Sequence, residues 1–168
     1  DHEYAESNYL IVLFQPPGSS IYDEQAMQIT RELTAALWQL PHTVRVDSIT
    51  NYPKLRVDGD TLSVDDLVPD TNLLTDQQLN LIREYARNDQ QIQGRLVSPN
   101  ENATALFASI TLPEDHLDSV LELSRQALLL KQDFEQRYPG STLHLNGDIA
   151  LENAMLQVTM DDILRVNP

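Results

Sequence analysis

The chain has 168 residues, 41% of them hydrophobic and 22% charged, a composition that is ordinary for a folded globular domain able to bury a core. Its charge is unusual, because 11 Lys and Arg residues face 26 Asp and Glu residues, for a formal net charge of −15. Such acidity argues against binding nucleic acid or anionic lipid, and the lack of cysteine excludes disulfides, thiolate metal sites and cysteine nucleophiles.

The chain first predicts a strand, a helix and a second strand. Residues 9–14 are apolar without alternation, which is typical of a central strand covered on both faces. Ser20, with Asp23 three residues later, predicts a helix N-cap, and residues 44–49 follow as the second strand. The helix between them carries one apolar stripe: Ala26, Ile29, Leu33, Leu37 and Leu40.

A hairpin and a second helix come next. Residues 55–64 predict a β-hairpin, because Asp58-Gly59 can supply the positive φ angles that tight turns require. Thr75 and Gln78 have the spacing of a capping box, so a helix is expected to begin there. Its inward positions are Leu79, Ile82 and Ala86.

The strand–helix pattern then repeats. Residues 95–97 are expected to pair with a strand at 104–112, Pro113 then opens a helix over 117–138, and residues 142–146 alternate as a further strand. The long helix has apolar positions at Leu117, Val120, Leu121, Ser124, Ala127, Leu128, Phe134 and Tyr138. A last helix is predicted from Ile149, Ala154, Val158 and Leu164.

This order of elements predicts an α+β fold. Without the hairpin and helix in the middle it is β-α-β-β-α-β, the ferredoxin-like split β-α-β plan that enzymes, sensors and transporter domains all use. We expect a single domain, residues 1–168, with a core at 8–50 and 94–147, an insertion at 51–93 and a terminal helix at 148–168.

Residue patterns that would support catalysis or metal binding are weak. The acidic turn at 58–60 places Gly59 second, whereas an EF-hand loop needs its glycine sixth. An acylphosphatase-like hydrolase would need a cation in the first strand-to-helix loop, and residues 15–20 contain none. The histidines, His2, His42, His116 and His144, have no ligand spacing. We therefore assign no catalytic, cofactor-binding or metal-ligating residue and expect no enzyme.

Several short motifs point to a family. The Ser-Ile-Thr-Asn segment at 48–51 and the acidic bend within 62–70 are followed by similar segments at 94–98, 104–105 and 147–154. In this order and spacing they resemble the first extracytoplasmic loop of RND-superfamily exporters of the MMPL-like, hydrophobe/amphiphile efflux type. The resemblance extends over nearly the whole chain, although each motif alone is short.

The resemblance implies a soluble, non-catalytic porter domain at the periplasmic face of the bacterial inner membrane. Its partners would be the transmembrane helices and second extracytoplasmic loop of a proton-driven exporter, and its substrates hydrophobic or amphiphilic molecules, with no substrate-binding residue assigned. Both ends of the chain look cut, which fits an excised segment. We also expect isolated chains to associate as a homo-oligomer that covers an exposed edge or apolar patch.

The sequence leaves one alternative from another class. A stand-alone ferredoxin-like module could sense a small polar ligand at a strand-to-helix loop and dimerise through its sheet. Amino-acid ligands would favour this module, whereas lipid-like ligands would favour the exporter domain.

Overall fold

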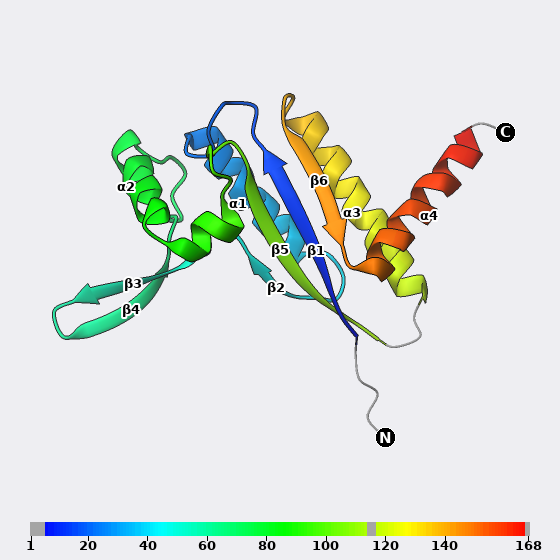
Figure 1. Ribbon diagram of the computed structural model, residues 1–168, viewed down its shortest axis with the longest axis horizontal. Coiled ribbons are helices and arrows are strands. Elements are labelled where there is room, and N and C mark those ends of the chain that lie inside the picture. The colour runs from blue at the N-terminus through cyan, green and yellow to red at the C-terminus, as the bar shows by residue number, and fades with distance from the viewer. Residues whose placement is uncertain (1–5, 114–116, 167–168) are drawn as a thin grey trace, which may run out of the picture.

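The computed structural model describes residues 6–113 and 117–166 (Figure 1). Its main sheet has the strand order β2-β5-β1-β6, and every neighbouring pair is antiparallel. β5 therefore separates β1 from β2, and β1 separates β5 from β6, so each predicted strand–helix–strand unit is split by a strand of the other. The strands are β1 (Glu6–Gln15), β2 (Thr43–Asp47), β5 (Thr104–Leu112) and β6 (Thr142–Gly147).

Helices α1 (Glu24–Trp38) and α3 (Leu117–Arg137) cover one face of this sheet (Figure 1). Helix α4 (Ile149–Val166) packs against α3 at the end of β6. The mixture of helices with an antiparallel sheet agrees with the predicted α+β class. The core between helices and sheet includes Leu10, Val12 and Phe14 of β1, Ile29, Leu33 and Leu37 of α1, Leu106, Ala108 and Ile110 of β5, and Leu123 and Ala127 of α3.

Strand β1 is central, as predicted, but it is covered on one face and not on both. Its side chains alternate between full burial and partial exposure, and Tyr9 exposes 46% of its surface. Ile11 and Leu13, on the same face as Tyr9, are half-buried. The apolar run was misleading because three aliphatic or aromatic side chains occupy the open face of the sheet.

The N-cap of helix α1 is Asp23, three residues after the predicted cap, Ser20. The Ser20 hydroxyl accepts a hydrogen bond from the Tyr22 backbone N–H in a local turn, so it is not the N-cap. The Asp23 carboxylate caps the helix by accepting from the Ala26 N–H at 2.6 Å. A negative group is favoured there because it lies at the positive end of the helix dipole.

The middle of the chain builds a second apolar cluster beside the sheet. It includes side chains of α2 (Asp76–Arg87) and of the π-helix η1 (Ile92–Leu96), while the hairpin of β3 (Pro53–Asp58) and β4 (Thr61–Asp66) contributes none. The predicted hairpin and the capping box are confirmed, but of the two predicted turn residues only Gly59 has a positive φ, because Asp58 is the last residue of β3 and pairs with Thr61. The cluster is centred on Ile21, Met27, Ile49, Leu67, Val68, Leu79, Ile82, Ile92 and Leu96.

The predicted pairing of residues 95–97 with β5 is wrong except at its last residue. Val97 forms an isolated bridge with Thr104, while the residues before it close a π-helical turn. The Leu96 carbonyl accepts a hydrogen bond from the Thr104 side-chain hydroxyl at 2.7 Å instead of joining a strand ladder.

Helix α4 is tied to the start of the sheet by Asp148. One carboxylate oxygen accepts from the Leu151 N–H at 3.0 Å, and the other accepts from the Asn8 side chain at 2.8 Å. The predicted inward residues Ala154 and Val158 are buried, but Ile149 and Leu164 are exposed by 81% and 69%. Leu117 at the start of α3 is also exposed, by 67%, whereas Leu123 takes the buried position there. No helix in the described ranges is long and apolar enough to cross a membrane.

Two further expectations fall partly on residues that the structure does not describe. These are the opening turn of the helix after Pro113, at residues 114–116, and the two ends of the chain, at residues 1–5 and 167–168. His2 and His116 lie among them.

Candidate functional site

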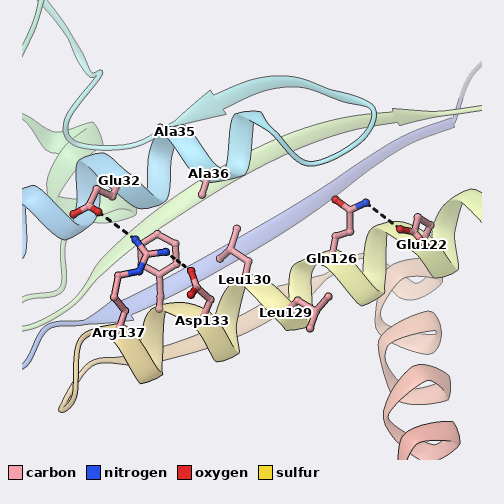
Figure 2. Close-up of a pocket in the computed structure, with 10 residues that line it drawn as sticks. Glu32, Ala35, Ala36, Glu122, Gln126, Leu129, Leu130, Asp133 and Arg137 are labelled. Atoms are coloured by element: carbon pink, nitrogen blue, oxygen red, sulfur yellow. Dashed lines mark hydrogen bonds and ion pairs between the residues drawn. The ribbon is translucent and has the colours of Figure 1, made fainter.

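A groove of about 760 Å³ runs between α1 and α3 on the helical side of the molecule (Figure 2). Helix α1 contributes small side chains, Ala35 and Ala36, which leave room between the two helices. The volume of the groove falls in the range of small-molecule sites. The floor is apolar and consists of Ala35, Ala36, Leu129, Leu130 and Phe134, and the polar lining residues are Glu32, Glu122, Gln126, Asp133 and Arg137.

One end of the groove is an ion-pair cluster around Arg137 (Figure 2). Its guanidinium donates to Glu32 Oε1 at 3.3 Å across the groove and to the Asp133 carboxylate on its own helix. The same guanidinium lies over the Phe134 ring, 4.7 Å from its centroid, so the charged cluster sits directly against the apolar floor. The hydrogen bond to Asp133 raises the pKa of Arg137, which keeps the cation charged.

Tyr138, the residue that follows α3, completes this cluster. Its hydroxyl donates to both oxygens of Glu32, at 2.8 and 2.6 Å. The hydrogen bond to Glu32 raises the pKa of Tyr138, so the phenol remains a neutral donor at physiological pH. Glu32 is thus fixed by α3 and its carboxylate faces the groove in a set orientation.

The opposite end of the groove holds Glu122, which accepts a hydrogen bond from Gln126 at 3.0 Å (Figure 2). The lining residues therefore include three carboxylates, Glu32, Glu122 and Asp133, and one guanidinium, Arg137. An apolar floor with a net negative rim can hold the hydrocarbon part of a molecule and attract a cationic or hydrogen-bond-donating head group.

A second groove, also of about 760 Å³, lies where the hairpin meets the acidic bend, between residues 54–57 and 65–70. The β3–β4 register places four aliphatic side chains on one face of the hairpin, all exposed by 61–67%. The hairpin projects from the body of the molecule (Figure 1). We name this surface the hairpin face: Leu55, Val57, Leu62 and Val64.

The motif at residues 48–51 is a buried structural network. Ser48 Oγ accepts from the Thr34 hydroxyl at 2.8 Å and lies 2.7 Å from Thr50 Oγ1. The Asn51 side chain accepts from the Ser48 N–H and donates to the Val46 carbonyl. These bonds end β2 and anchor the turn after it against α1. The motif therefore stabilises the fold and does not face either groove.

The residues weighed for chemistry in the sequence are not brought together. His42 and His144 lie on different strands or turns, and the structure places Asp23, a carboxylate, at the helix N-terminus where a phosphate would need to bind. Across residues 6–113 and 117–166, no group of three or more His, Asp or Glu side chains could hold a metal ion.

Sequence reasoning assigned no groove residue. The signals that could have been used were the adjacent small residues Ala35-Ala36 on the flank of an otherwise large-residue stripe and the Asp133–Arg137 pair at helical spacing. Neither signal identifies a groove without knowing that α1 and α3 lie side by side.

Comparisons with known proteins do not place the chain in a family. No protein-family model matches it, and no curated protein matches its sequence.

Proposed function

We propose that this chain is a non-catalytic, extracytoplasmic porter domain of a proton-driven RND-superfamily exporter for hydrophobic or lipid-like molecules. Its place would be the periplasmic face of a bacterial inner membrane. There it would pack against the transporter's membrane helices and second extracytoplasmic loop. The observation that carries the proposal is the α1–α3 groove, an apolar trough with a charged rim.

The strand order supports the fold that this proposal requires. The order β2-β5-β1-β6, with antiparallel neighbours and both helices on one face, supports the proposed ferredoxin-like split β-α-β plan, in which the hairpin, α2 and η1 would be an insertion. The buried Ser48–Thr50–Asn51 network is consistent with the motif resemblance, because a turn of this kind must keep its residues to keep its geometry.

The groove chemistry suggests which amphiphiles would bind. The floor offers Leu129 and Leu130 to a hydrocarbon chain, while Glu32 and Asp133 present carboxylates beside it. A single-chain cationic amphiphile therefore satisfies both parts of the groove, and an anionic one of equal chain length meets electrostatic repulsion at the rim.

Binding of dodecyltrimethylammonium and dodecyl sulfate, each below its critical micelle concentration, tests the proposal. Calorimetry is expected to show tighter binding of the cation. Ala35→Trp, which fills the groove, is expected to weaken both by at least about fivefold, because it displaces the chain from the floor. Gln28→Trp, two helical turns before Ala35 on the same exposed face but outside the groove lining, is the matched control.

Two results would contradict the groove assignment. One is equal binding by the two tryptophan variants, and the other is a cation preference that survives Glu32→Gln and Asp133→Asn together. The exporter assignment itself is checked separately by the hydropathy of the parent gene on both sides of this segment, which must encode membrane-spanning helices.

The open face of the sheet favours a second candidate, the stand-alone sensing module that dimerises through its sheet. Tyr9, Ile11, Leu13 and Phe107 share that face through the β1–β5 register. A thermal-shift screen in which amino acids stabilise the chain and the amphiphiles do not would support this module over the exporter domain.

A further inference from the structure

Helix α4 carries apolar side chains on two opposite faces. One face is buried against α3 and the end of the sheet and consists of Leu151, Ala154, Met155 and Val158. At about 100° per residue, a second apolar row lies on the far side of the helix. Its side chains are exposed by between 54% and 81% of their surface: Ile149, Leu156, Met160, Ile163 and Leu164.

This outer row follows the spacing of a coiled coil. Ile149, Leu156 and Ile163 are seven residues apart, at one core position of a heptad, and Asn153 and Met160 occupy the other. These five residues are called the α4 seam. We propose that the α4 seam is an interaction surface that docks on the α4 seam of a second copy of this chain, as a parallel two-stranded coiled coil.

Asn153 indicates both that the partner is a second copy of the chain and that the two helices run parallel. In a parallel, in-register pair, the two Asn153 side chains meet at the same core layer and hydrogen-bond to each other, as core asparagines do in two-stranded coiled coils. In the antiparallel arrangement, Asn153 would lie opposite Ile163, and its amide would be buried without a partner. A second copy supplies the matching amide at the required height.

The flanks of the α4 seam allow two acidic chains to approach. In the parallel pair, Glu152 of one copy lies beside Gln157 of the other, and Thr159 lies beside Leu164. Acid therefore meets no acid across the contact, although each chain has a net charge of −15. Leu164 also widens the apolar strip at its C-terminal end, where it is 69% exposed.

The position of α4 leaves the seam accessible. Among the side chains of α4 that the structure describes, Val158 is the last buried one, and those from Thr159 to Arg165 are exposed. Figure 1 shows the C-terminal half of α4 extending away from the sheet and from α3. The C-terminal half of the seam is therefore open to a second helix.

The size of the seam sets the strength of the contact. The seam spans little more than two heptads, so the surface area that it can bury is smaller than the roughly 800 Å² per partner of a standard interface. Because each helix is already ordered by its own domain, the association does not have to order a free peptide. We expect a dissociation constant on the order of 10–100 µM.

The test uses the chain's lack of cysteine, so that one introduced thiol reports one position. Met160→Cys places a thiol in the seam, and Asp161→Cys places one beside it on the helix, at a comparably exposed residue. With a short bismaleimide at about 100 µM protein, the Met160→Cys dimer is expected to form at least about tenfold faster. Sedimentation equilibrium of the unmodified chain is expected to show a reversible monomer–dimer equilibrium.

Two further variants test the chemistry of the seam. Leu156→Glu is expected to abolish the dimer and leave the thermal unfolding midpoint nearly unchanged, because Leu156 is 60% exposed. Asn153→Leu is expected to tighten association at least about tenfold, since it replaces a polar core layer by an apolar one.

The proposal is overturned by any of three results. These are equal cross-linking of Met160→Cys and Asp161→Cys, an unchanged dimer in Leu156→Glu, and preferential cross-linking of mixed Asn153→Cys and Ile163→Cys chains, which would mean an antiparallel pair. A dimer formed through the hairpin face or the open sheet face would give the first two results. The proposal does not depend on the exporter assignment, and its failure would leave the groove binding experiment unaffected.

Discussion

Neutralising Glu101 is expected to destabilise the fold by about 2 kcal/mol, because this residue joins three parts of the chain. Its carboxylate accepts two hydrogen bonds of 2.8 Å from Arg87 and one of 3.3 Å from Arg83, all from helix α2. Its backbone carbonyl accepts from the Ile21 N–H at 2.8 Å, which ties the loop before β5 to the loop before α1.

The magnitude follows from the exposure of the partners. The Glu101 side chain is 11% exposed, whereas the Arg83 and Arg87 side chains are 37% and 55% exposed. A hydrogen bond to a charged group contributes about 1.5–3 kcal/mol when buried, and an exposed ion pair contributes about 0–1 kcal/mol. The hydrogen bonds of Glu101 lie between these limits, because the carboxylate is buried and its partners are exposed, so Glu101→Gln is expected to cost about 2 kcal/mol.

Urea unfolding of four chains measures the effect: the original, Glu101→Gln, Arg87→Gln and the double variant. The loss in the double variant is expected to be smaller than the sum of the two single losses, because both substitutions remove the same ion pair. The hydrogen bond from Arg87 lowers the pKa of Glu101, so its contribution is present above the ordinary glutamate pKa, near about 4.3, and is lost as pH falls through the lower folded-state value. The difference between the original chain and Glu101→Gln must therefore shrink below about pH 4.

The backbone of Glu101 provides the control. Its φ of 61° is in the left-handed region, which costs a non-glycine residue about 1 kcal/mol. Glu101→Gly removes the charge and relieves that cost, so it is expected to destabilise the fold by less than Glu101→Gln does. A coupling below about 0.3 kcal/mol, or a loss that is equal at pH 7 and pH 3, would refute the ion-pair account.

Two other substitutions test buried positions. The Tyr22 hydroxyl is buried without a hydrogen-bond partner among the described residues, so Tyr22→Phe is expected to stabilise the chain by up to about 1 kcal/mol at pH 7. Burial raises the pKa of Tyr22, so the folded state loses stability above about pH 10, where the unfolded phenol ionises, and urea midpoints should show less of this loss in Tyr22→Phe. A Cβ at Gly147 would lie 2.8 Å from Leu151 Cδ2, so Gly147→Ala is expected to cost about 1–3 kcal/mol. Thermal unfolding measures it against Gly94→Ala, whose Cβ meets no atom within 4 Å, and equal midpoints would contradict the tight contact of α4 with β6.

The elements that could be predicted from the sequence are those whose limits depend on neighbouring residues. Strand 104–112 matches β5 because alternation and the following proline are local signals. The Thr75 capping box and the turn at Gly59 are confirmed for the same reason, since each depends on residues two or three positions apart. Residue propensity and spacing are sufficient to predict an element when neighbouring residues alone decide between helix, strand and turn.

The errors arose where a distant segment decides the outcome. The apolar run in β1 does not state that helices cover one face of the sheet, and nothing near residue 96 indicates that Thr104 will bind its carbonyl. The α1–α3 groove could not be predicted for the same reason. Glu32 and Arg137 are far apart in the sequence, and the strand order of the sheet brings their helices together. Local patterns in a single sequence do not indicate which distant helices lie side by side.

The acidity of the chain and its exposed apolar surfaces act together on association. A net charge of −15 repels other copies at long range, but at physiological salt this repulsion falls off over about 8 Å. Apolar contact acts at shorter range, so association is favoured only where an apolar surface has few acidic neighbours. The α4 seam meets this condition through Gln157 and Thr159, whereas the reverse side of the hairpin carries Asp58 and Asp65 as well as Lys54 and Arg56. The charge thereby suppresses indiscriminate association and favours contact through the α4 seam.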